Sequence, residues 1–461
     1  MITVKEKIKE NAGFQYIVEN LQLMSGAGRR KLLALPLLTS KEAIETQYDR
    51  IEKFVTFLFS NDKKNIFIDL QHQLMRLHDI QGTLHNLNTH VVLDEIELFE
   101  LKSFAFICMA MRKDIAALGM EQQLPMPDTQ EVFNLLDPDK SGVVNFYIYD
   151  SYDERLREVR QQLKGCDINS ETYATLFAQQ NELQQQVIEK LSQQLWNQAK
   201  TLSEAFEQMT YIDLIQAMAV QAQEWKLCRP TLSHTVIEYR NLFNPRLKQH
   251  KEQLGLRYQS IDIHLNEELC IVTGANMAGK TVMLKSLSIA QLMAQFGMFV
   301  PAKKATLPLV EDVVLCIGDE QNEMNGLSSF ASEITQINSL LQRSKTERLL
   351  ILIDEPARTT NPLEGKAIVQ AVGTLLKEHF CVITTHYSQL GLQSHKLRVK
   401  GFVGNDPATP LTPENINQFM DYALVEDENE MVPHEALRIA SLLGCDKEFI
   451  HLAETFSGLK K

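Results

Sequence analysis

Hydrophobic residues recur at spacings of three and four from the N-terminus to about residue 230, which is typical of α-helices. The most regular stretch steps by 7, 4, 4, 4, 7, 4 and 3 residues and has Gln-rich positions between its apolar ones, which are Leu176, Leu183, Val187, Leu191, Leu195, Leu202, Phe206 and Met209. This pattern predicts one helix about 35 residues long with a single apolar face. At ~1.5 Å per residue the helix would span roughly 50 Å, more than a compact domain needs, so we interpret it as a lever.

The pattern changes after Pro230, because proline disfavours helix in the residue before it and cannot continue one. Short β-rich apolar runs then alternate with helical segments, at residues 269–273, 313–317, 349–353 and 381–384. This alternation predicts an α/β layer with a mostly parallel sheet. Two more strand-like pieces follow residue 399, and a helical tail begins near residue 434. We therefore predict a helical lever domain at 1–230, an α/β domain at 231–433 and a C-terminal helical element at 434–461.

Composition narrows the class of protein. The chain has 461 residues, 44% of them hydrophobic and 23% charged, and its seven scattered cysteines contain no Cys-x-x-Cys pair. These values predict a globular protein of a reducing compartment without a disulfide framework or zinc site. The N-terminus carries charges where a signal peptide is apolar, and no run approaches the roughly 20 apolar residues that span a bilayer, so we expect a cytoplasmic protein with no membrane partner. The net charge of −13 means that any contact with nucleic acid must be local.

The strongest motif follows the apolar run 269–273 and opens a helix rich in Leu and Met. It reads Gly274, Ala275, Asn276, Met277, Ala278, Gly279, Lys280, Thr281. In such a P-loop the glycines let backbone N–H groups surround phosphates, the lysine pairs with the β- and γ-phosphates, and the threonine hydroxyl holds magnesium. The motif predicts a site for ATP and Mg²⁺, with an incidental glycine turn as the alternative.

Two adjacent acids, Asp354 and Glu355, end the apolar run 349–353. Ligands of open α/β sheets bind at the carboxyl ends of strands. Because successive side chains of a strand point to opposite faces, the two acids must divide their roles. We assign Asp354 to magnesium, directly or through water, and Glu355 to polarising the water that attacks the γ-phosphate.

Two further segments carry polar residues at the same sheet edge. Thr384, Thr385 and His386 end the next strand, where His386 could sense the γ-phosphate, although a lone histidine is more often structural. Residues 317–330, IGDEQNEMNGLSSF, are too polar for a core element and place adjacent serines before a helix. Such serines cap helices or donate to phosphate, and spacing alone does not say whose phosphate that would be.

These segments resemble the MutS family of mismatch-repair ATPases. TGANMAGKT is similar to the family's ATP loop, and IGDEQNEMNGLSSF resembles the segment that reaches the nucleotide of the opposite subunit. The resemblance implies a homodimer with a composite site. In it Asn276 and Lys280 bind phosphate in cis, Ser328 touches the γ-phosphate in trans, and His386 is a switch histidine. The tail HEALRIASLLGCDKEFIHLAETF looks like the family's dimerisation element.

The resemblance extends upstream. Gly28-Arg29, LLALPLL and Arg50 resemble the start of the family's lever domain, and FYIYDSYDERLREVRQQL resembles its helical re-entry. Because nothing precedes residue 1, we expect the family's mismatch-reading and connector domains to have no counterpart here. Only a turn fits between residues 163 and 173, so we expect the DNA-embracing clamp to be lost. Pro356 to Thr360 replaces the family's Gly-rich turn, and the Asp-Glu-Pro triplet also resembles ABC transporter ATPases, whose Leu-Ser-Gly-Gly signature is absent here.

Three other features have plain alternatives. Residues 137–148 imitate an EF-hand loop, but position 12 is Ile148 rather than the bidentate Glu, so we interpret them as a polar turn. The basic residues 29–31 fit a solvated helix face better than a DNA patch. Tyr258, before the P-loop strand, either stacks on adenine or packs as a core residue.

Two functions fit these observations. The first is a MutS-like ATPase whose dimer changes shape with nucleotide during DNA mismatch repair or a related DNA transaction, without recognising mismatches itself. The acidic charge and the expected loss of the clamp argue against DNA as the partner. The alternative is an ATP-driven protein-remodelling factor, such as one that reactivates an adenosylcobalamin-dependent aminomutase.

Overall fold

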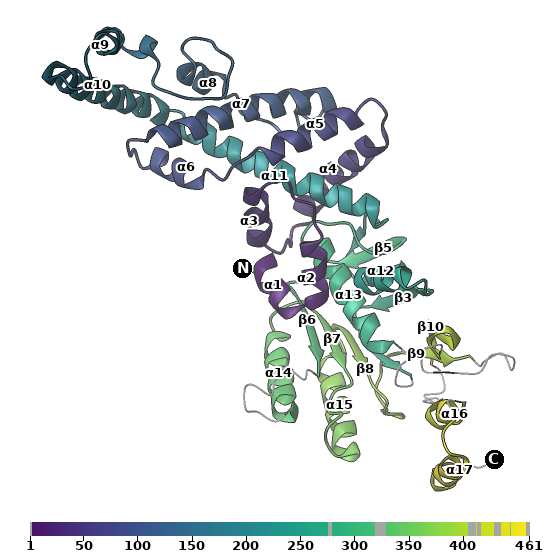
Figure 1. The fold of residues 1–461 in the computed structure, drawn as a ribbon. Coiled ribbons are helices and arrows are strands. Elements are labelled where there is room, and N and C mark those ends of the chain that lie inside the picture. Colours follow the sequence, from purple (N-terminus) through teal and green to yellow (C-terminus); the bar gives the residue numbers. More distant parts are fainter. Residues whose placement is uncertain are drawn as a thin grey trace. The chain divides into compact units, whose positions relative to one another are not determined.

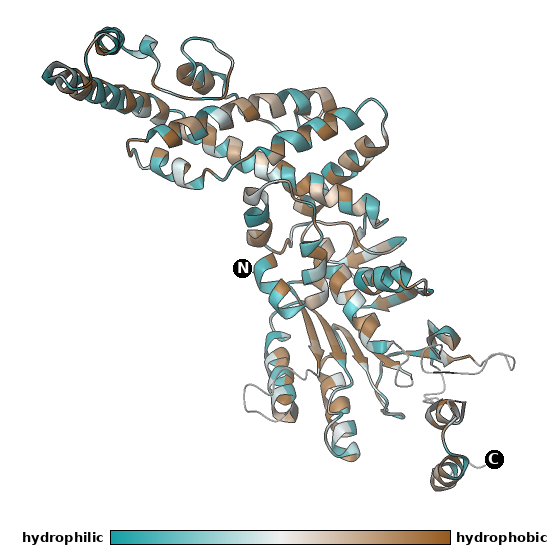
Figure 2. Cartoon of the chain, viewed as in Figure 1, coloured by the Kyte–Doolittle hydropathy of each residue, from teal (hydrophilic) through white to brown (hydrophobic). Residues whose placement is uncertain are grey.

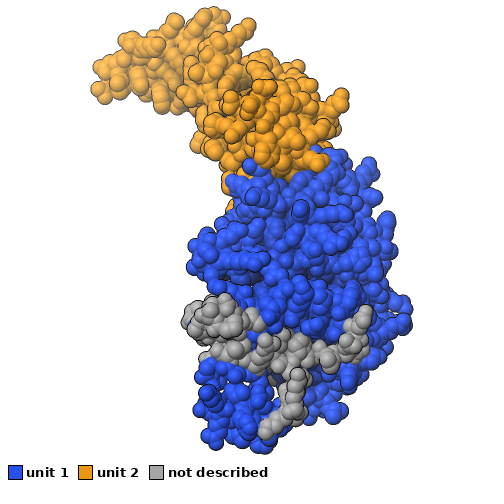
Figure 3. All heavy atoms as spheres, turned by 90° about the vertical axis from the view of Figure 1, so that its right-hand side faces the viewer, with its two compact units in different colours: residues 1–21, 35–49, 221–461 blue, residues 22–34, 50–220 orange. Residues whose placement is uncertain are grey.

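The chain folds into two compact units (Figure 3). The computed structural model describes residues 2–274, 279–318, 329–403, 412, 416–427, 435–442 and 444–457. Unit 1 contains residues 1–21, 35–49 and 221–461, and unit 2 contains residues 22–34 and 50–220. Helices α4 (Lys41–Phe59) and α11 (Ala199–Glu224) contribute residues to both units.

Unit 2 is built from helices (Figure 1). Besides parts of α4 and α11 it contains α3 (Gly26–Ala34), α5 (Lys64–Met75), α6 (Gln81–Asn88), α7 (Glu95–Leu118), α8 (Gln130–Leu136), α9 (Glu154–Lys164) and α10 (Glu171–Trp196), with a 3-10 turn at Asp150–Tyr152. Helix α7 shows why the sequence folds in this way. Asp94 and Glu97 form a capping box at its start, and Gly119 ends it in the left-handed conformation with φ +74°.

The predicted single helix of about 35 residues is wrong in one respect, because α10 and α11 are separate helices of 26 residues each. They are separated at residues 197–198, where the Gln198 N–H donates to Leu195 O at 2.8 Å, a tight i to i−3 bond. The apolar stripe itself is confirmed, since Leu183, Leu195 and Leu202 are among its buried members. Residues 165–170 join α9 to α10, which leaves room only for a turn, as predicted.

Unit 1 contains two sheets. The smaller has the strand order β1-β5-β2-β3, formed by β1 (Thr231–Ser233), β2 (Val236–Leu242), β3 (Ile261–Asn266) and β5 (Lys304–Pro308). The larger has the order β10-β9-β4-β8-β7-β6, formed by β4 (Leu269–Thr273), β6 (Asp312–Ile317), β7 (Leu349–Asp354), β8 (Phe380–Thr384), β9 (His395–Phe402) and β10 (Met420–Glu426). Its pairs are parallel except β9 with β10. The predicted combination of a helical part and an α/β part is confirmed.

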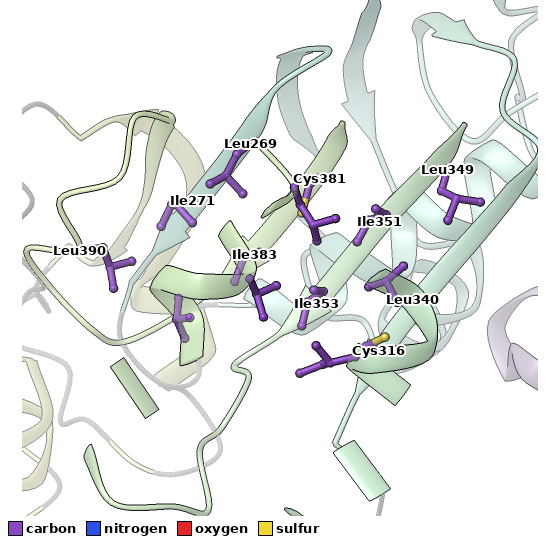
Figure 4. Packing of buried hydrophobic residues seen from close by; sticks show 14 residues of the cluster. Leu269, Ile271, Cys316, Leu340, Leu349, Ile351, Ile353, Cys381, Ile383 and Leu390 are labelled. Atoms are coloured by element: carbon purple, nitrogen blue, oxygen red, sulfur yellow. The ribbon is translucent and has the colours of Figure 1, made fainter. Parts of the chain in front are cut away.

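Successive side chains of each strand point to opposite sides, so the larger sheet has two faces, and both are apolar. Leu349, Ile351 and Ile353 point to one face, where they join a core cluster with residues of α14 (Ser329–Arg343) and α15 (Pro362–Leu375), shown in Figure 4. Strands β6, β7 and β8 are hydrophobic along their length, whereas the helices of unit 2 alternate in hydropathy (Figure 2). A sheet covered on both faces requires such continuous apolar strands.

The opposite face of the larger sheet packs against α13 (Lys280–Gln295), which contacts β6, β7 and β8. The N-terminal helices α1 (Val4–Glu10) and α2 (Ala12–Glu19) belong to the same unit. Phe14 of α2 stacks on Phe296 with ring centroids 5.3 Å apart, and the Asn11 side chain donates to the Ser288 hydroxyl of α13 at 2.9 Å. Residues more than 270 positions apart therefore share this core.

The remaining elements of unit 1 are α12 (Pro245–Gln253), a 3-10 turn at Ile416–Phe419, α16 (Glu435–Leu442) and α17 (Lys447–Phe456). Helices α16 and α17 contact each other. In the described part of the chain, no helix combines the length and hydrophobicity that crossing a bilayer requires.

Candidate nucleotide site

The P-loop segment joins β4 to α13 at the carboxyl edge of the larger sheet. Gly274 follows β4, and Gly279 precedes α13 with φ +78°, a left-handed conformation that favours glycine. A Cβ at Gly279 would lie 3.0 Å from a ring carbon of Tyr422, so close approach also favours glycine there. Among the described residues no side chain caps the start of α13, and backbone N–H groups at a helix start can bind an anion. The predicted site residues Ala275, Asn276, Met277 and Ala278 lie outside the described residues.

Lys280, the first residue of α13, is held at this edge. Its side chain is 5% exposed, and its Nζ donates to Gly274 O at 2.7 Å. The same Nζ lies 3.1 Å from Glu355 Oε1. The structure thus brings the predicted phosphate-binding lysine and the predicted catalytic glutamate, 75 positions apart in the numbering, into direct contact.

Asp354 shares a strand face with Leu350 and Leu352, the face that α13 covers. The Thr281 hydroxyl, from the first turn of α13, donates to Asp354 Oδ2 at 2.6 Å. The Thr384 hydroxyl, from the end of β8, donates to Asp354 Oδ1 at 2.6 Å. Both carboxylate oxygens of Asp354 are therefore aligned by hydroxyl groups from neighbouring elements.

Glu355 begins a turn with unusual backbone geometry. Glu355 has φ +43° and Ala357 has φ +60°, and each such conformation in a non-glycine residue costs about 1–3 kcal/mol unless its surroundings impose it. The Glu355 N–H donates to both the carbonyl and the hydroxyl oxygen of Thr384, at 3.1 Å each. Strand alternation would send Glu355 to the face opposite Asp354, but the positive φ takes it out of the strand pattern and allows it to reach Lys280.

The remaining predicted site residues are His386 and Ser328. His386 lies two residues beyond β8, at the same edge, and its side chain is exposed with its ring 4.3 Å from that of Tyr387. No hydrogen bond between His386 and the P-loop or the acids occurs among the described residues. Ser328 lies outside the described residues, immediately before α14.

Sequence reasoning did not assign a role to Thr384 or to Glu333. Thr384 is completely buried and contacts both acids. Glu333 of α14 accepts a hydrogen bond from the Ala357 N–H at 2.7 Å. A polar residue at the last position of a strand next to the acid pair was the available signal for Thr384. Nothing in the spacing of Glu333 distinguishes it from a solvated helix residue.

A cavity of about 280 Å³ lies beside the start of α13. Its lining includes Tyr258, Gln259, Gly279, Met283 and Tyr422. The Tyr258 hydroxyl accepts a hydrogen bond from the Asn244 N–H at 2.8 Å, and burial raises its pKa. Tyr258 is thus anchored at its polar end and lines an apolar cavity with the rest of the ring, which suits a planar base next to phosphate groups.

The residues at the edge fit a nucleotide with magnesium. Thr281 and Asp354 offer adjacent oxygen atoms of the type that Mg²⁺ prefers, and the remaining positions on the ion would be taken by phosphate and water. In the described part of the chain there is no group of three or more His, Cys, Asp or Glu residues that could hold a metal by itself.

Comparison with known proteins relates much of unit 1 to one protein family. Residues 270–455 match the family model of MutS domain V. Endonuclease MutS2 of Caldanaerobacter subterraneus subsp. tengcongensis is 32% identical over 247 residues, which are 52% of this chain and 30% of that protein. DNA mismatch repair protein MutS of Thermus thermophilus is 32% identical over 218 residues, 45% of this chain and 25% of that protein. Endonuclease MutS2 of Ligilactobacillus salivarius is 30% identical over 309 residues, 62% of this chain and 35% of that protein. The chain spans well under half the length of these relatives.

Proposed function

The chain belongs to the MutS family, and we propose that it is a dimeric ATPase whose conformation follows its nucleotide state. The observation that carries this proposal is the meeting of four side chains at one sheet edge: Lys280 with Glu355 at 3.1 Å, and Thr281 with Asp354 at 2.6 Å. Phosphoryl transfer to water uses such an arrangement, in which a lysine that binds phosphate and a hydroxyl that binds magnesium face two acids.

In the proposed reaction the adenine lies in the cavity lined by Tyr258, and the triphosphate runs to the start of α13. Backbone N–H groups of α13 and the Lys280 ammonium bind the β- and γ-phosphates. Thr281 and Asp354 would hold Mg²⁺, which would neutralise charge that develops on the phosphate oxygens. The triphosphate competes with Glu355 for Lys280, which frees the Glu355 carboxylate to accept a proton from the attacking water. His386 and Ser328 act as sensors of the γ-phosphate, Ser328 from the partner subunit.

A titration with nucleotide tests this proposal. Calorimetry with ATP and Mg²⁺ should show binding to the wild-type chain and strongly reduced binding to Lys280→Ala, because the variant lacks the cation that meets the phosphates. The matched control is Lys366→Ala, which removes a half-buried lysine from α15 and should leave nucleotide binding normal. Absence of adenine nucleotide binding by the wild-type chain would refute the proposed function.

The dimer proposal rests partly on α17. Its side chains Phe449, Leu452 and Phe456 are 58%, 47% and 85% exposed and follow each other at spacings of three and four, so they share one face of the helix. An apolar helix face of this kind suits a second copy of the same chain. Leu452→Glu should shift the mass measured by light scattering from dimer towards monomer, and an unchanged dimer would contradict this contact.

For the partner on which the ATPase acts, we propose a DNA transaction, because relatives are named for DNA mismatch repair. The net charge of −13 favours the second candidate, a protein client. Binding to duplex and branched DNA, measured by fluorescence anisotropy over a range of salt concentrations, separates the two. An affinity for DNA that falls steeply as the salt concentration rises would support DNA as the partner. Absence of DNA binding at low salt would support a protein client instead.

A further inference from the structure

The turn after the acid pair is tied to helix α14 by one hydrogen bond from a buried group. The Ala357 N–H donates to Glu333 Oε1 at 2.7 Å, and Ala357 is completely buried. A buried backbone N–H needs a partner, and Glu333 supplies it from another element. Because Ala357 has φ +60°, the turn depends on outside contacts to keep its shape.

A second anchor holds the beginning of the same turn. The Glu355 N–H donates to two oxygen atoms of Thr384 on β8, an interior strand of the larger sheet. The two hydrogen bonds connect the turn to different elements. Thr384 belongs to a strand of the sheet, whereas the position of Glu333 depends on that of α14, a helix that begins at Ser329. Residue Ser328, the proposed sensor of the partner's nucleotide, comes immediately before that helix.

The other side of the turn is closely packed. A Cβ at Gly365 of α15 would lie 2.2 Å from the Tyr387 hydroxyl oxygen and 3.0 Å from Ala357 O. The turn therefore has little room to move towards α15. A displacement of α14 that carried Glu333 with it would be transmitted to Ala357 and Glu355 rather than absorbed by a gap.

We infer that Glu333 is a positioning residue, which couples the start of α14 to the placement of Glu355 through the Ala357 N–H. This inference rests on the proposed ATPase function and adds a route by which events at the start of α14 reach the hydrolytic carboxylate. It assigns Glu333 no contact with substrate.

The electrostatic environment of Glu333 agrees with this role. Burial raises the pKa of Glu333, whereas the Ala357 N–H and the charge of Arg358 lower it. The ionised carboxylate has thus lost part of its hydration and depends on these two groups of the turn. The pKa of Glu333 is raised on balance, so these two groups offset only part of the cost of burying the charge.

Steady-state ATPase kinetics and nucleotide binding of substituted full-length chains test the inference. Glu333→Asp keeps the charge but withdraws the oxygen by one methylene group, and Glu333→Ala removes the acceptor. Both should lower kcat by about tenfold or more, since small displacements of a reacting group are costly, while the Kd for ATP stays within about twofold. Glu333→Gln keeps an oxygen acceptor of the same length and should recover kcat to within about threefold of wild type.

The control is Glu364→Ala on α15. Glu364 accepts a hydrogen bond from the exposed Thr360 hydroxyl, near the same turn, and its loss should leave kcat unchanged. Wild-type kcat in Glu333→Ala and Glu333→Asp, in an otherwise active protein, overturns the inference alone. A loss in Glu333→Gln as large as that in Glu333→Ala also overturns it. Absence of ATPase activity in the wild-type chain overturns the proposed function as well, so the two failures are distinguishable.

Discussion

Replacement of Thr384 by valine removes one hydroxyl from the centre of the site and keeps the branched shape of the side chain. The hydroxyl donates to Asp354 Oδ1 at 2.6 Å and accepts the Glu355 N–H at 3.1 Å. Asp354 keeps its bond from Thr281, and the Glu355 N–H keeps the Thr384 carbonyl. The substitution therefore disturbs the alignment of both acids without removing either.

The bond to Asp354 involves a charged acceptor, so its loss should cost about 1.5–3 kcal/mol. If the same alignment is needed in the transition state, roughly 1.4 kcal/mol per factor of ten converts this cost into a kcat about ten- to a hundredfold lower. The Kd for ATP should change little, because Lys280 and the start of α13 are untouched. The free energy of unfolding should fall by a similar about 1.5–3 kcal/mol.

The assay combines kcat from a phosphate-release measurement, Kd from calorimetry and unfolding in urea. Thr384→Ser retains a hydroxyl and should recover most of the lost kcat, and Thr374→Val, which removes an exposed hydroxyl from α15, should have no effect. A wild-type kcat in Thr384→Val would refute the reasoning, and so would an equal loss in the serine and valine variants.

Four further outcomes are expected. Glu355→Gln should bind ATP but hydrolyse it about a hundredfold more slowly or worse in single-turnover experiments, and unchanged turnover would refute water activation by this residue. Ser328→Ala should lower hydrolysis and spare nucleotide binding by the isolated subunit, whereas equal loss of both would count against a contact in trans. In unit 2, Lys102→Met leaves the buried Asp137 carboxylate without the cation 3.0 Å away, so urea unfolding should show a loss of about 3–5 kcal/mol, and a loss below about 1 kcal/mol would contradict a buried ion pair. Burial raises the pKa of Asp137, but hydrogen bonds from neighbouring groups and the charge of Lys102 outweigh burial and lower the pKa to about 2. The stabilisation by this carboxylate should therefore be complete above its unfolded pKa of about 4 and disappear as the pH falls towards 2. The variant Asp137→Asn should flatten this pH dependence of the free energy of unfolding.

The sequence located the P-loop segment and the acid pair because their chemistry needs particular residue types at fixed spacing within short, contiguous segments. The structure then places Lys280 beside Glu355 and Thr281 beside Asp354. Hydrophobic spacing likewise identified the strands and the apolar stripe of α10 and α11. It missed the break at residues 197–198, because a local change of hydrogen bonding does not alter the spacing of buried residues.

The expectation about Glu355 shows where a pattern stops being informative. Strand alternation indicates that the two adjacent acids have different roles, but it does not place Glu355, which lies just past the regular strand, because alternation holds only while the backbone stays extended. The φ of +43° is imposed by bonds to Thr384 and by the turn that Glu333 holds at Ala357, both contributed by other parts of the chain. Residues 29 and 24 positions away in the numbering cannot be identified from a local pattern.

By itself, the sequence predicted the helical and strand-forming segments and the short motifs that we propose to carry the chemistry, since periodicity and motif spacing are local properties. Only the tertiary structure decided that α2 packs on α13, that the Thr384 hydroxyl contacts both acids, and that Glu333 supports the turn that follows them. A hydroxyl or carboxylate obtains such a role from the groups placed beside it, and that placement depends on how distant elements pack in space.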